Sequence, residues 1–564
     1  MNKTKRILAL SLVCLLVVAL AACGGGGGTS PSGSASPGSS TTPGAGSSPE
    51  ASSSPGTSSS PGTSASPNTG SSPDSGSSPG TAESARDTLN LSVSQDTGTL
   101  DPIGLSGGYI AVGYCYMEPL WDVTEDNETI WLLATGVDEV SPTQLTIHIR
   151  EGVTFSNGNP LTAHDVLFTL RLQKDYPNTA VNTQSLDLDN SSVIDDYNLD
   201  LRYTDHNVAW KTILSAVLIA DEESYDPDVV SASPIGTGPY VITEYLVNSH
   251  AFLERREDYW GVKPAIKYIR FRVLAEAAQI VNALATGLID IGTVPAQDIE
   301  YVSNLPGYTV RERFTGSWAL VGFNVSEESI FHNVEARYAV CHAIDRQAIV
   351  NLSFDGRAEL TDNPGSKYLF DYEPRFGNMH ETYSIGYNVE LAKQYAESSG
   401  LAGSEVRIMT NGSAEYVMMA EIMQAQLKEI CVTVVILNYD NATFRTLAND
   451  ASAFDIRVTM SASPNKLVAD ALVNGVRYSA IFSAPGSWDG VEQYLEFAPK
   501  ALSTSNDQER SEYTYQMLQM YTTACLSYGV CDLTSTIAMS TDLNDNFVFR
   551  VSGGIRYQDL SFKS

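Results

Sequence analysis

The chain has 564 residues, enough for several domains or one large two-lobed domain, and 43% of them are apolar, as expected for a protein that buries a core. Its 34 basic and 66 acidic residues give a formal charge of −32 at pH 7. So acidic a chain is a poor partner for nucleic acid, whose phosphates attract basic surfaces. We therefore expect no nucleic-acid partner, and the charge is most simply read as an aid to solubility.

Residues 1–22 have the three parts of a secretory signal peptide: a basic start, an apolar run at 7–20 and a small-residue end. The apolar run is too short to span a membrane comfortably. The sequence Leu-Ala-Ala-Cys at 20–23 resembles the lipobox of bacterial lipoproteins. That resemblance implies cleavage before Cys23 and a diacylglycerol group on its sulfur. The alternative is a plain signal peptide that happens to be followed by a cysteine.

Residues 23–87 have the composition of a tether. Beyond Cys23 the segment consists mainly of Gly, Ser, Pro and Thr in SSPG-like repeats, with almost no apolar side chain larger than alanine. Such a segment cannot bury enough apolar surface to offset the entropy lost on ordering. We predict a disordered link between the lipid and the folded part.

The folded part opens with residues 89–93, which alternate apolar and polar side chains as a half-buried strand does. Residues 145–150 alternate in the same way and lead to an Asn-Gly pair at 157–158, which favours a tight hairpin. Thr162 followed by Asp165 predicts a helix start with a near capping box.

Residues 234–239 contain two glycines and two prolines, which indicates a sharp turn dictated by the backbone. Strand-like runs follow at 240–245, 250–255 and 266–273, and a Tyr-Trp-Gly turn at 259–261 precedes the last of them. These residues by themselves predict a β-meander with a sharp entrance.

The second half mixes helices and strands. We expect helices at 274–288, 335–346, 388–400, 416–430 and 510–526, and strands at 318–324, 405–409 and 432–437. The strand–helix–strand order around the 416–430 helix predicts that its two strands pair in parallel.

Several of these segments together resemble family 5 of the bacterial solute-binding proteins, the extracytoplasmic receptors of oligopeptide, dipeptide and nickel ABC importers. The resemblance rests on GTGPY at 236–240 with DYWGVKPAI at 258–266, MEPL at 117–120, REGVTFSNGNPLTAHDV at 150–166, FN at 323–324 and ARYAVCHAIDR at 336–346. It covers about residues 88–564. The longest of these motifs forms a hairpin and a helix start, so it identifies the fold and not a catalytic site.

The resemblance implies an α/β protein with a two-lobed periplasmic-binding-protein-like fold, of type II and of the large cluster with an extra subdomain, in which helices flank mixed β-sheets. Lobe I would take residues 88–325, with the inserted subdomain at about 131–231. Lobe II would take residues 326–525, and residues 526–564 would return to lobe I.

The resemblance also implies a substrate-binding lipoprotein of an ABC importer. Such a protein captures a small solute, here a peptide or a peptide-like compound, between its lobes and delivers it to a membrane permease. We expect permease and ATPase subunits as partners, an extracytoplasmic position on the cell membrane through the lipid anchor, and a monomer. We expect neither a cofactor nor a catalytic residue.

The expected ligand-binding residues combine aromatic walls with small or polar groups, as ligand clefts do. They are Ser106, Gly107, Tyr109, Tyr114, Trp318, Asn411, Ser463 and Trp488. Tyr109, Tyr114 and Trp318 lie near segments that face the cleft in the family, and Trp488 lies in a Gly-Ser-rich loop. Core packing is the alternative for each of these aromatic side chains.

One position departs from the peptide-binding members of the family. In those members an acidic residue that follows an alanine pairs with the α-amino group of the peptide. Here Phe454-Asp455 matches the start of the segment, but Ser463 occupies the acidic position. Serine cannot supply a charge-assisted bond to an ammonium group. The sequence therefore favours another small solute, or a peptide that is held differently.

Two other functions stay open. Residues 104–108 match G-x-S-x-G, which would make Ser106 the nucleophile of a secreted serine hydrolase, although Asp101-Pro102 stands where that motif needs a strand. A sensor or chaperone of the same fold that takes no part in transport is the second. The seven histidines form no HExxH motif and no close cluster, so we expect no metal site.

Beyond the signal peptide and Cys23 the chain has five cysteines, which are Cys115, Cys341, Cys431, Cys525 and Cys531. An odd number cannot all pair within one chain. Cys525 and Cys531 are the only pair close in sequence, and whether they form a disulfide stays open. Cys341 and Cys431 stand in apolar contexts, so we expect them to be buried free thiols.

Overall fold

The computed structural model describes residues 86–563, except for 102, 104, 106–108, 177–178, 180–182, 363–365 and 478. The predicted signal peptide, Cys23 and nearly all of the predicted tether lie outside the described residues, as do Ser106 and Gly107. Within the described part of the chain, no helix combines the length and the apolar character needed to cross a membrane.

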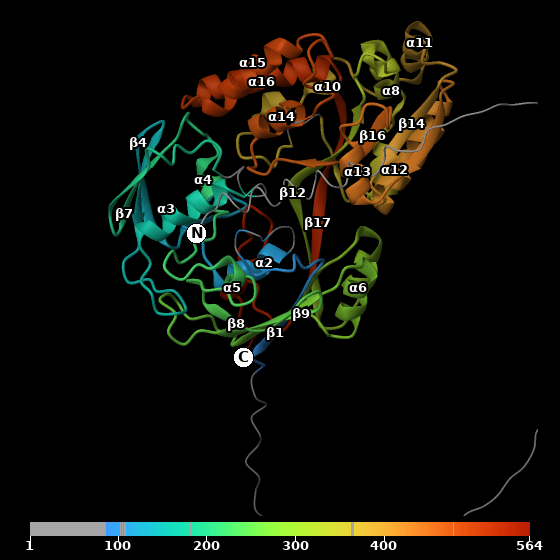
Figure 1. The fold of residues 1–564 in the computed structure, drawn as a ribbon. Coiled ribbons are helices and arrows are strands. Elements are labelled where there is room, and N and C mark those ends of the chain that lie inside the picture. Colours follow the sequence, from blue (N-terminus) through green and yellow to red (C-terminus); the bar gives the residue numbers. More distant parts are fainter. Residues whose placement is uncertain are drawn as a thin grey trace, which may run out of the picture. The chain divides into compact units, whose positions relative to one another are not determined.

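The first strand pairs with a segment far along the chain (Figure 1). β1 (Thr88–Val93) lies parallel to β10 (Tyr268–Val273), and β9 (His250–Arg255) and β8 (Tyr240–Leu246) complete the order β1-β10-β9-β8. Alternate side chains, among them Leu89 and Phe271, are fully buried. The half-buried strands predicted from the alternation of apolar residues are confirmed.

The glycine-rich turn before β8 packs directly against the end of α2 (Ile110–Tyr116). A Cβ atom on Gly236 would overlap the carbonyl oxygen of Tyr116, and one on Gly238 would lie 2.5 Å from the Tyr116 carbonyl carbon. Gly238 also donates its N–H to the Tyr116 carbonyl oxygen at 3.0 Å. Because only glycine permits so close an approach, this turn fixes where α2 ends.

Two buried charged groups hold the same turn. The guanidinium of Arg256 donates to the carbonyl oxygens of residues 154–155 and 236–238 at 3.1 to 3.4 Å. Glu118 accepts from the Tyr259 hydroxyl at 2.6 Å and from the Trp260 indole at 3.1 Å. Desolvation raises the pKa of the buried Glu118 carboxyl to about 7. Three sequence motifs thus meet in one group, the motif cluster, which consists of Glu118, Thr237, Arg256, Tyr259 and Trp260.

A second four-stranded sheet is antiparallel and has the order β4-β5-β7-β6. Its strands are β4 (Ala134–Ser141), β5 (Gln144–Ile149), β6 (Ser192–Asp195) and β7 (Asn198–Arg202). α3 (Ala163–Lys174) contacts this sheet and begins with the expected capping box of Thr162 and Asp165. The short elements around it are β2 (Trp121–Val123), β3 (Thr129–Trp131), α4 (Trp210–Leu214) and α5 (Pro227–Val230).

The largest sheet has the order β11-β17-β12-β16-β14-β15, and β13 lies beside β17. Its strands are β11 (Ile291–Thr293), β12 (Tyr308–Phe323), β13 (Glu359–Leu360), β14 (Glu405–Thr410), β15 (Thr433–Asn438), β16 (Ile456–Ala462) and β17 (Ser527–Ser540). β14 and β15 are parallel and are joined through α12 (Ala414–Lys428), which confirms the predicted strand–helix–strand unit.

Two strands of this sheet are long and connect two apolar cores. β12 pairs antiparallel with β17 over most of its 16 residues, and the register shifts between Phe314 and Trp318. Trp318 and Phe323 of β12 lie in the core around α12, whereas Ile537 and Met539 of β17 lie in the core around β1. Figure 1 shows both strands running between these two parts of the fold. The sequence predicted only 318–324 as a strand, because the first half of β12 carries polar and partly exposed side chains.

The remaining helices are α6 (Ala277–Ala285), α7 (Ile299–Ser303), α8 (Val334–Ala343), α9 (Arg346–Ser353), α10 (Met379–Thr382), α11 (Val389–Ser399), α13 (Asn441–Leu447), α14 (Val468–Arg477), α15 (Val491–Ser503) and α16 (Asp507–Thr523). The helix predicted over 335–346 is confirmed as α8, but it ends at Ala343, because the chain breaks between α8 and α9. Asp345 has extended backbone there, and its carboxylate caps α9 by accepting from the Ala348 N–H at 3.1 Å.

The described residues pack into four apolar clusters. The largest surrounds α8, α12, α16 and the adjoining halves of β12 and β17, and a second surrounds β1, β9, β10 and α2. A third lies under α3, and a fourth lies between α6 and α7. Leu543 and Leu560 near the C-terminus belong to the cluster around β1, as a return of the chain to lobe I requires. The exact lobe boundaries stay a prediction.

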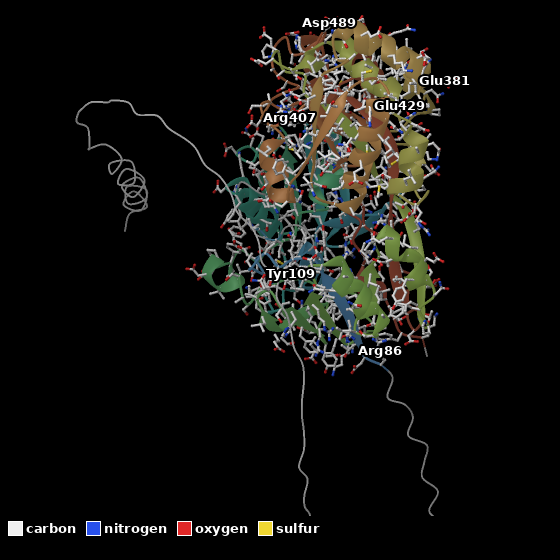
Figure 2. All side chains as sticks on the ribbon, turned by 90° about the vertical axis from the view of Figure 1, so that its right-hand side faces the viewer. Arg86, Tyr109, Glu381, Arg407, Glu429 and Asp489 are labelled. Atoms are coloured by element: carbon white, nitrogen blue, oxygen red, sulfur yellow. The ribbon has the colours of Figure 1, made fainter. Side chains whose placement is uncertain are left out.

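In Figure 2, Glu381 and Asp489 lie toward one end of the molecule and Arg86 toward the other.

The cysteines have neighbours that sequence proximity did not indicate. All five in the described part of the chain are free, and Cys525 faces Cys341 at a sulfur–sulfur distance of 2.9 Å. Cys341 is buried as expected. Cys431 is exposed, which corrects the expectation of a buried thiol, because it occupies a left-handed turn (φ 61°) just after α12.

Candidate ligand-binding site

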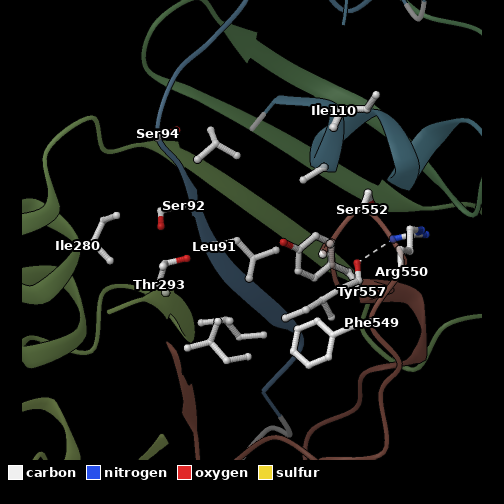
Figure 3. Close-up of a pocket in the computed structure, with 18 of the residues that line it drawn as sticks. Leu91, Ser92, Ser94, Ile110, Ile280, Thr293, Phe549, Arg550, Ser552 and Tyr557 are labelled. Carbon is white, nitrogen blue, oxygen red and sulfur yellow. Dashed lines mark hydrogen bonds between the residues drawn. The ribbon is translucent and has the colours of Figure 1, made fainter. Parts of the chain in front are cut away.

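A cavity of about 630 Å³ lies beside β1, α2 and β11, and the C-terminal loop at 549–557 forms one of its walls (Figure 3). Leu91, Ile110 and Phe549 are among its apolar lining residues. Its polar lining residues are Ser92, Ser94, Tyr114, Thr293, Arg550, Ser552 and Tyr557. An apolar wall with a few polar groups is the usual lining of a small-molecule site.

A second cavity, of about 130 Å³, adjoins the first at three side chains. Tyr114, Arg550 and Ser552 line both cavities, and we call these three residues the junction cluster. On its other side the second cavity is lined by Pro464 and Asn465, which follow β16. The junction cluster therefore lies where residues of the predicted lobe I face residues of the predicted lobe II.

Arg550 is buried, and its charge is largely compensated. Its Nε donates to Asp122 at 3.0 Å, and its Nη1 donates to the Ile555 carbonyl oxygen at 2.9 Å. Arg556 also pairs with Asp122 and donates through Nε to Asp559 at 2.7 Å. Two guanidinium groups and two carboxylates thus balance. The site can offer a solute directional hydrogen bonds, but no large excess of positive charge.

Tyr114 connects this ionic group to α2. The Arg550 guanidinium lies 4.3 Å from the centre of the Tyr114 ring, a cation–π contact. Burial raises the pKa of Tyr114 to about 12, so its hydroxyl is neutral and can donate a hydrogen bond at physiological pH. Within the described residues no hydrogen bond runs from Arg550 Nη2 to another group.

The other predicted site residues lie in different surroundings. Tyr109 is 1% exposed and packs 6.2 Å from the Tyr245 ring, and Trp318 is 1% exposed within the largest core. Trp488 is buried, and its indole donates to the Phe482 carbonyl oxygen at 2.8 Å. Of the predicted side chains within the described residues, Tyr114 is the one that lines the two cavities.

The predicted polar residues at helix starts act as caps or form local turns. Ser463 is buried, accepts from the Leu467 N–H at 3.0 Å and donates to Asp470 at 3.1 Å. Asn411 accepts from the Ser413 N–H at 3.2 Å, just before α12. The residues directly after Ser463 line the second cavity, so its segment reaches the site although its hydroxyl is used elsewhere.

Sequence reasoning did not identify Asp122, Asn465, Arg550 or Ser552. Arg550 and Ser552 lie in a short C-terminal stretch without a recognisable motif, and only the fold brings them to α2. The Gly-Gly pair at 553–554 that follows Ser552 was the one signal of a special turn.

A further hollow of about 660 Å³ lies within the predicted lobe II. Its lining residues all come from 342–391 and include Arg346, Asp362 and His380. His380 Nδ1 lies 2.9 Å from Asp362, and burial lowers the pKa of His380. Because no residue of the predicted lobe I lines this hollow, it does not fit a site between lobes. Within the described residues no group of three or more His, Cys, Asp or Glu side chains is placed to hold a metal ion.

Known proteins of similar sequence and structure agree with this fold. The oligopeptide-binding protein AppA of Bacillus subtilis is 29% identical over 268 residues, which are 45% of this chain and 48% of AppA, so this match spans about half of that relative. The substrate-binding protein CtaP of Listeria monocytogenes has a TM-score of 0.74 at 19% identity, over 85% of this chain and all of CtaP. NikA of Brucella suis, solved in complex with Fe(III)-EDTA, also has a TM-score of 0.74, at 18% identity, over 84% of this chain and all of NikA.

These structural likenesses confirm the predicted fold, a mixed α/β solute-binding-protein architecture. The family model described as bacterial extracellular solute-binding proteins, family 5 Middle, matches residues 128–480. This match covers more than half of the chain and confirms the resemblance seen in the sequence motifs. The chain belongs to family 5 of the bacterial extracellular solute-binding proteins.

Proposed function

We propose that the chain is the substrate-binding protein of an ABC importer and that it binds its solute at the junction cluster. The observation that carries this proposal is the sharing of Tyr114, Arg550 and Ser552 by two cavities, the smaller of which also reaches Pro464 and Asn465. A solute placed there would touch both predicted lobes. It would then hold them together, because closure of two lobes requires a ligand that binds the closed form more tightly than the open form.

β12 and β17 are the elements about which we expect the lobes to move. Both run between the two cores, and their pairing is interrupted between Phe314 and Trp318. Hinges are formed by a few residues that absorb changes in backbone angles, and an interrupted strand pair can do so at small cost. We expect solute binding to lower the radius of gyration measured by X-ray scattering.

The lining favours a peptide or a peptide-like solute over a strongly charged one. Most of the larger cavity is apolar, which suits aliphatic or aromatic side chains, and its hydroxyl groups can pair with amide groups. The Ser463 hydroxyl is occupied at the start of α14, so it does not replace the carboxylate that binds the peptide amine in relatives. The Arg550 guanidinium and Tyr114 hydroxyl would instead orient the solute through carbonyl or carboxylate oxygens.

The location completes the proposal. The family is extracellular, and the signal peptide and lipobox pattern at residues 1–23 support a lipid anchor at Cys23 on the outer face of the cell membrane. A monomer would deliver the solute to a permease, and an ATPase partner would drive transport. The lipid is tested by detergent phase separation: the exported chain should partition into the detergent phase, and a Cys23→Ser variant should remain in the aqueous phase.

The binding site is tested with the exported protein in native mass spectrometry, which would show a carried-over solute as an added mass. A Ser552→Trp variant should lose that mass, because Ser552 lines both cavities and an indole there would fill the space between them. Val262→Trp is the matched control, because Val262 is 93% exposed in another loop and should leave the solute bound. Equal retention of solute in both variants would contradict the site.

The alternatives receive no support from the family, whose members bind solutes. We expect no turnover of peptides or esters by the purified chain. A hydrolytic activity that disappears in a Ser106→Ala variant would contradict this expectation.

A further inference from the structure

Cys341 and Cys525 face each other in the largest core, where the end of α8 meets the end of α16. Cys341 lies in the last turn of α8, and Cys525 lies between α16 and β17, 184 residues further along the chain. Both side chains are at most 1% exposed, and their sulfur atoms are 2.9 Å apart. A disulfide needs a sulfur–sulfur distance of about 2.05 Å, so an approach of roughly 0.9 Å would allow the bond.

The backbone conformation at position 525 is one that cysteine rarely adopts. The Cys525 N–H donates to the Thr522 carbonyl oxygen, and the Leu526 N–H donates to the Tyr521 carbonyl oxygen. These two bonds form a Schellman motif, which ends α16. Cys525 occupies the left-handed position of that motif, with φ 47°, where glycine is the usual residue. A cysteine there costs stability, so its presence calls for a compensating role of the side chain.

The neighbouring contacts align the two segments. Arg337 of α8 donates through Nε to the Ala524 carbonyl oxygen at 2.8 Å, and the Tyr338 hydroxyl donates to that of Thr523 at 2.6 Å. Cys341 is one turn further along α8 and meets the next residue, Cys525. One face of α8 therefore contacts three consecutive residues at the end of α16, and the cysteine pair is the contact that can become covalent.

We propose that Cys341 and Cys525 form a disulfide bond in the exported protein and that this bond staples α8 to the start of β17. The family is extracellular, and disulfides persist in oxidising compartments. No other pair of cysteines in the described part of the chain has its sulfur atoms in contact. The bond fixes the end of β17 that lies in the predicted lobe II. Bending of β17 is therefore confined to the part of the strand near the register shift at Phe314.

The oxidant is a thiol–disulfide oxidoreductase in its disulfide form. One cysteine thiolate attacks a sulfur of that disulfide and forms a mixed disulfide, which releases the first thiolate of the oxidoreductase. The second cysteine thiolate then attacks the cysteine sulfur of the mixed disulfide and releases the second. Two thiols of the chain lose two protons and two electrons, and the oxidoreductase disulfide gains them as two thiols. The reaction takes place while the chain folds, because both sulfurs are buried in the finished core.

The direct test maps cysteine states in the full chain after export through an oxidising compartment. The protein is denatured without reductant, its free thiols are alkylated, and its peptides are identified by mass spectrometry. We expect a linked pair of peptides that contain Cys341 and Cys525, with alkylated Cys115, Cys431 and Cys531. Alkylation of Cys341 and Cys525, or a link from either of them to Cys531, would overturn the proposal.

A second measurement uses Cys341→Ser and, as the matched control, Cys531→Ser, because Cys341 and Cys531 are both fully buried. Closing so long a loop stabilises a chain mainly by constraining its unfolded state. Reductant should therefore lower Tm by on the order of 5 °C in the wild type and in Cys531→Ser, and leave Cys341→Ser unchanged. An equal response of all three proteins would overturn the stapling role, and the peptide map of the wild type decides the case if a variant does not fold.

Discussion

Two polar clusters lie next to α2, and they differ in how their groups are bonded within the protein. In the motif cluster, Arg256 donates to a ring of backbone carbonyl oxygens, and both oxygens of Glu118 accept from aromatic side chains. In the junction cluster, Tyr114 and Arg550 border two cavities. Tyr114 lies four residues before Glu118 in the chain. The first cluster holds the turn before β8, whereas the second borders the cavities in which we propose that the solute binds.

The motif cluster and the junction cluster also differ in how clearly the sequence indicates them. Most residues of the motif cluster come from the segments GTGPY, DYWG and EPL, which carry the resemblance to the family. The junction cluster is built from a tyrosine inside α2 and a C-terminal loop that follows no motif. Recognisable motifs in this chain therefore mark its architecture, whereas the residues that we propose to face the solute lie outside these motifs.

The largest effect is expected from Gly238→Ala, which would break the motif cluster by steric overlap. The added Cβ would lie 2.5 to 2.8 Å from backbone atoms of Cys115, Tyr116 and Met117, none of which can move without shifting α2. We expect a loss of about 3 kcal/mol or more in the free energy of unfolding, measured with urea. Gly386→Ala is the control, because nothing lies within 4 Å of its Cβ position, and it should change stability by less than about 1 kcal/mol.

A pH dependence should also separate the two clusters. The ordinary pKa of a glutamate is 4.5, and burial raises that of Glu118 to about 7, so the folded chain binds more protons than the unfolded chain between these values. The stability due to Glu118 is thus fully present below pH 4.5 and is lost as pH rises through 7. The loss amounts to about 3 kcal/mol. Urea unfolding between pH 5 and pH 8 should show this slope in the wild type.

The matched variants for this slope are Glu118→Gln and Glu421→Gln. Glu118→Gln should lose most of the slope, because glutamine does not titrate. Glu421→Gln, at an exposed position of α12, should keep it. Identical pH profiles for the three proteins would show that the motif cluster is not the titrating group.

A smaller effect is expected in the junction cluster, and it should appear in binding instead of stability. Ser552 is exposed and lines both cavities, so Ser552→Trp should fold normally while its indole competes with the solute. We expect solute affinity to fall by about tenfold or more, or about 1.4 kcal/mol, by isothermal titration calorimetry. A fall in stability with unchanged affinity would reverse the assignment of the two clusters.

The smallest effect concerns the contact from lobe II. Asn465→Ala removes a polar side chain that lines the second cavity from the segment after β16. We expect an affinity about threefold to tenfold lower, with the change mainly in the dissociation rate, because this contact is made once the lobes have closed. Stopped-flow kinetics would check this, and an effect confined to the association rate would argue against closure over the solute.

Local rules predicted most of the architecture. Alternation placed β1 and β5 within one residue, and the spacing of Thr162 and Asp165 gave the capping box of α3. The failures arose where tertiary structure overrides local pattern. The first half of β12 is polar because it is partly exposed between the cores, and the break at Asp345 is set by a cap that the apolar pattern of its helix hides.

The site was less predictable, because it depends on contacts between distant parts of the chain. Arg550 meets Tyr114 across more than 400 residues of sequence, and no periodicity reports such a contact. The cysteines show the same limit. Proximity in sequence suggested Cys525 with Cys531, but both lie near one strand and face different neighbours, and the partner of Cys525 comes from α8.

The most direct test of the account is a crystal structure of the exported protein with its carried-over solute. The account predicts density for the solute in contact with Tyr114, Arg550 and Ser552 on one side and with Asn465 on the other. A solute held in the hollow around Arg346 and His380, or one that touches residues of a single lobe, would contradict it.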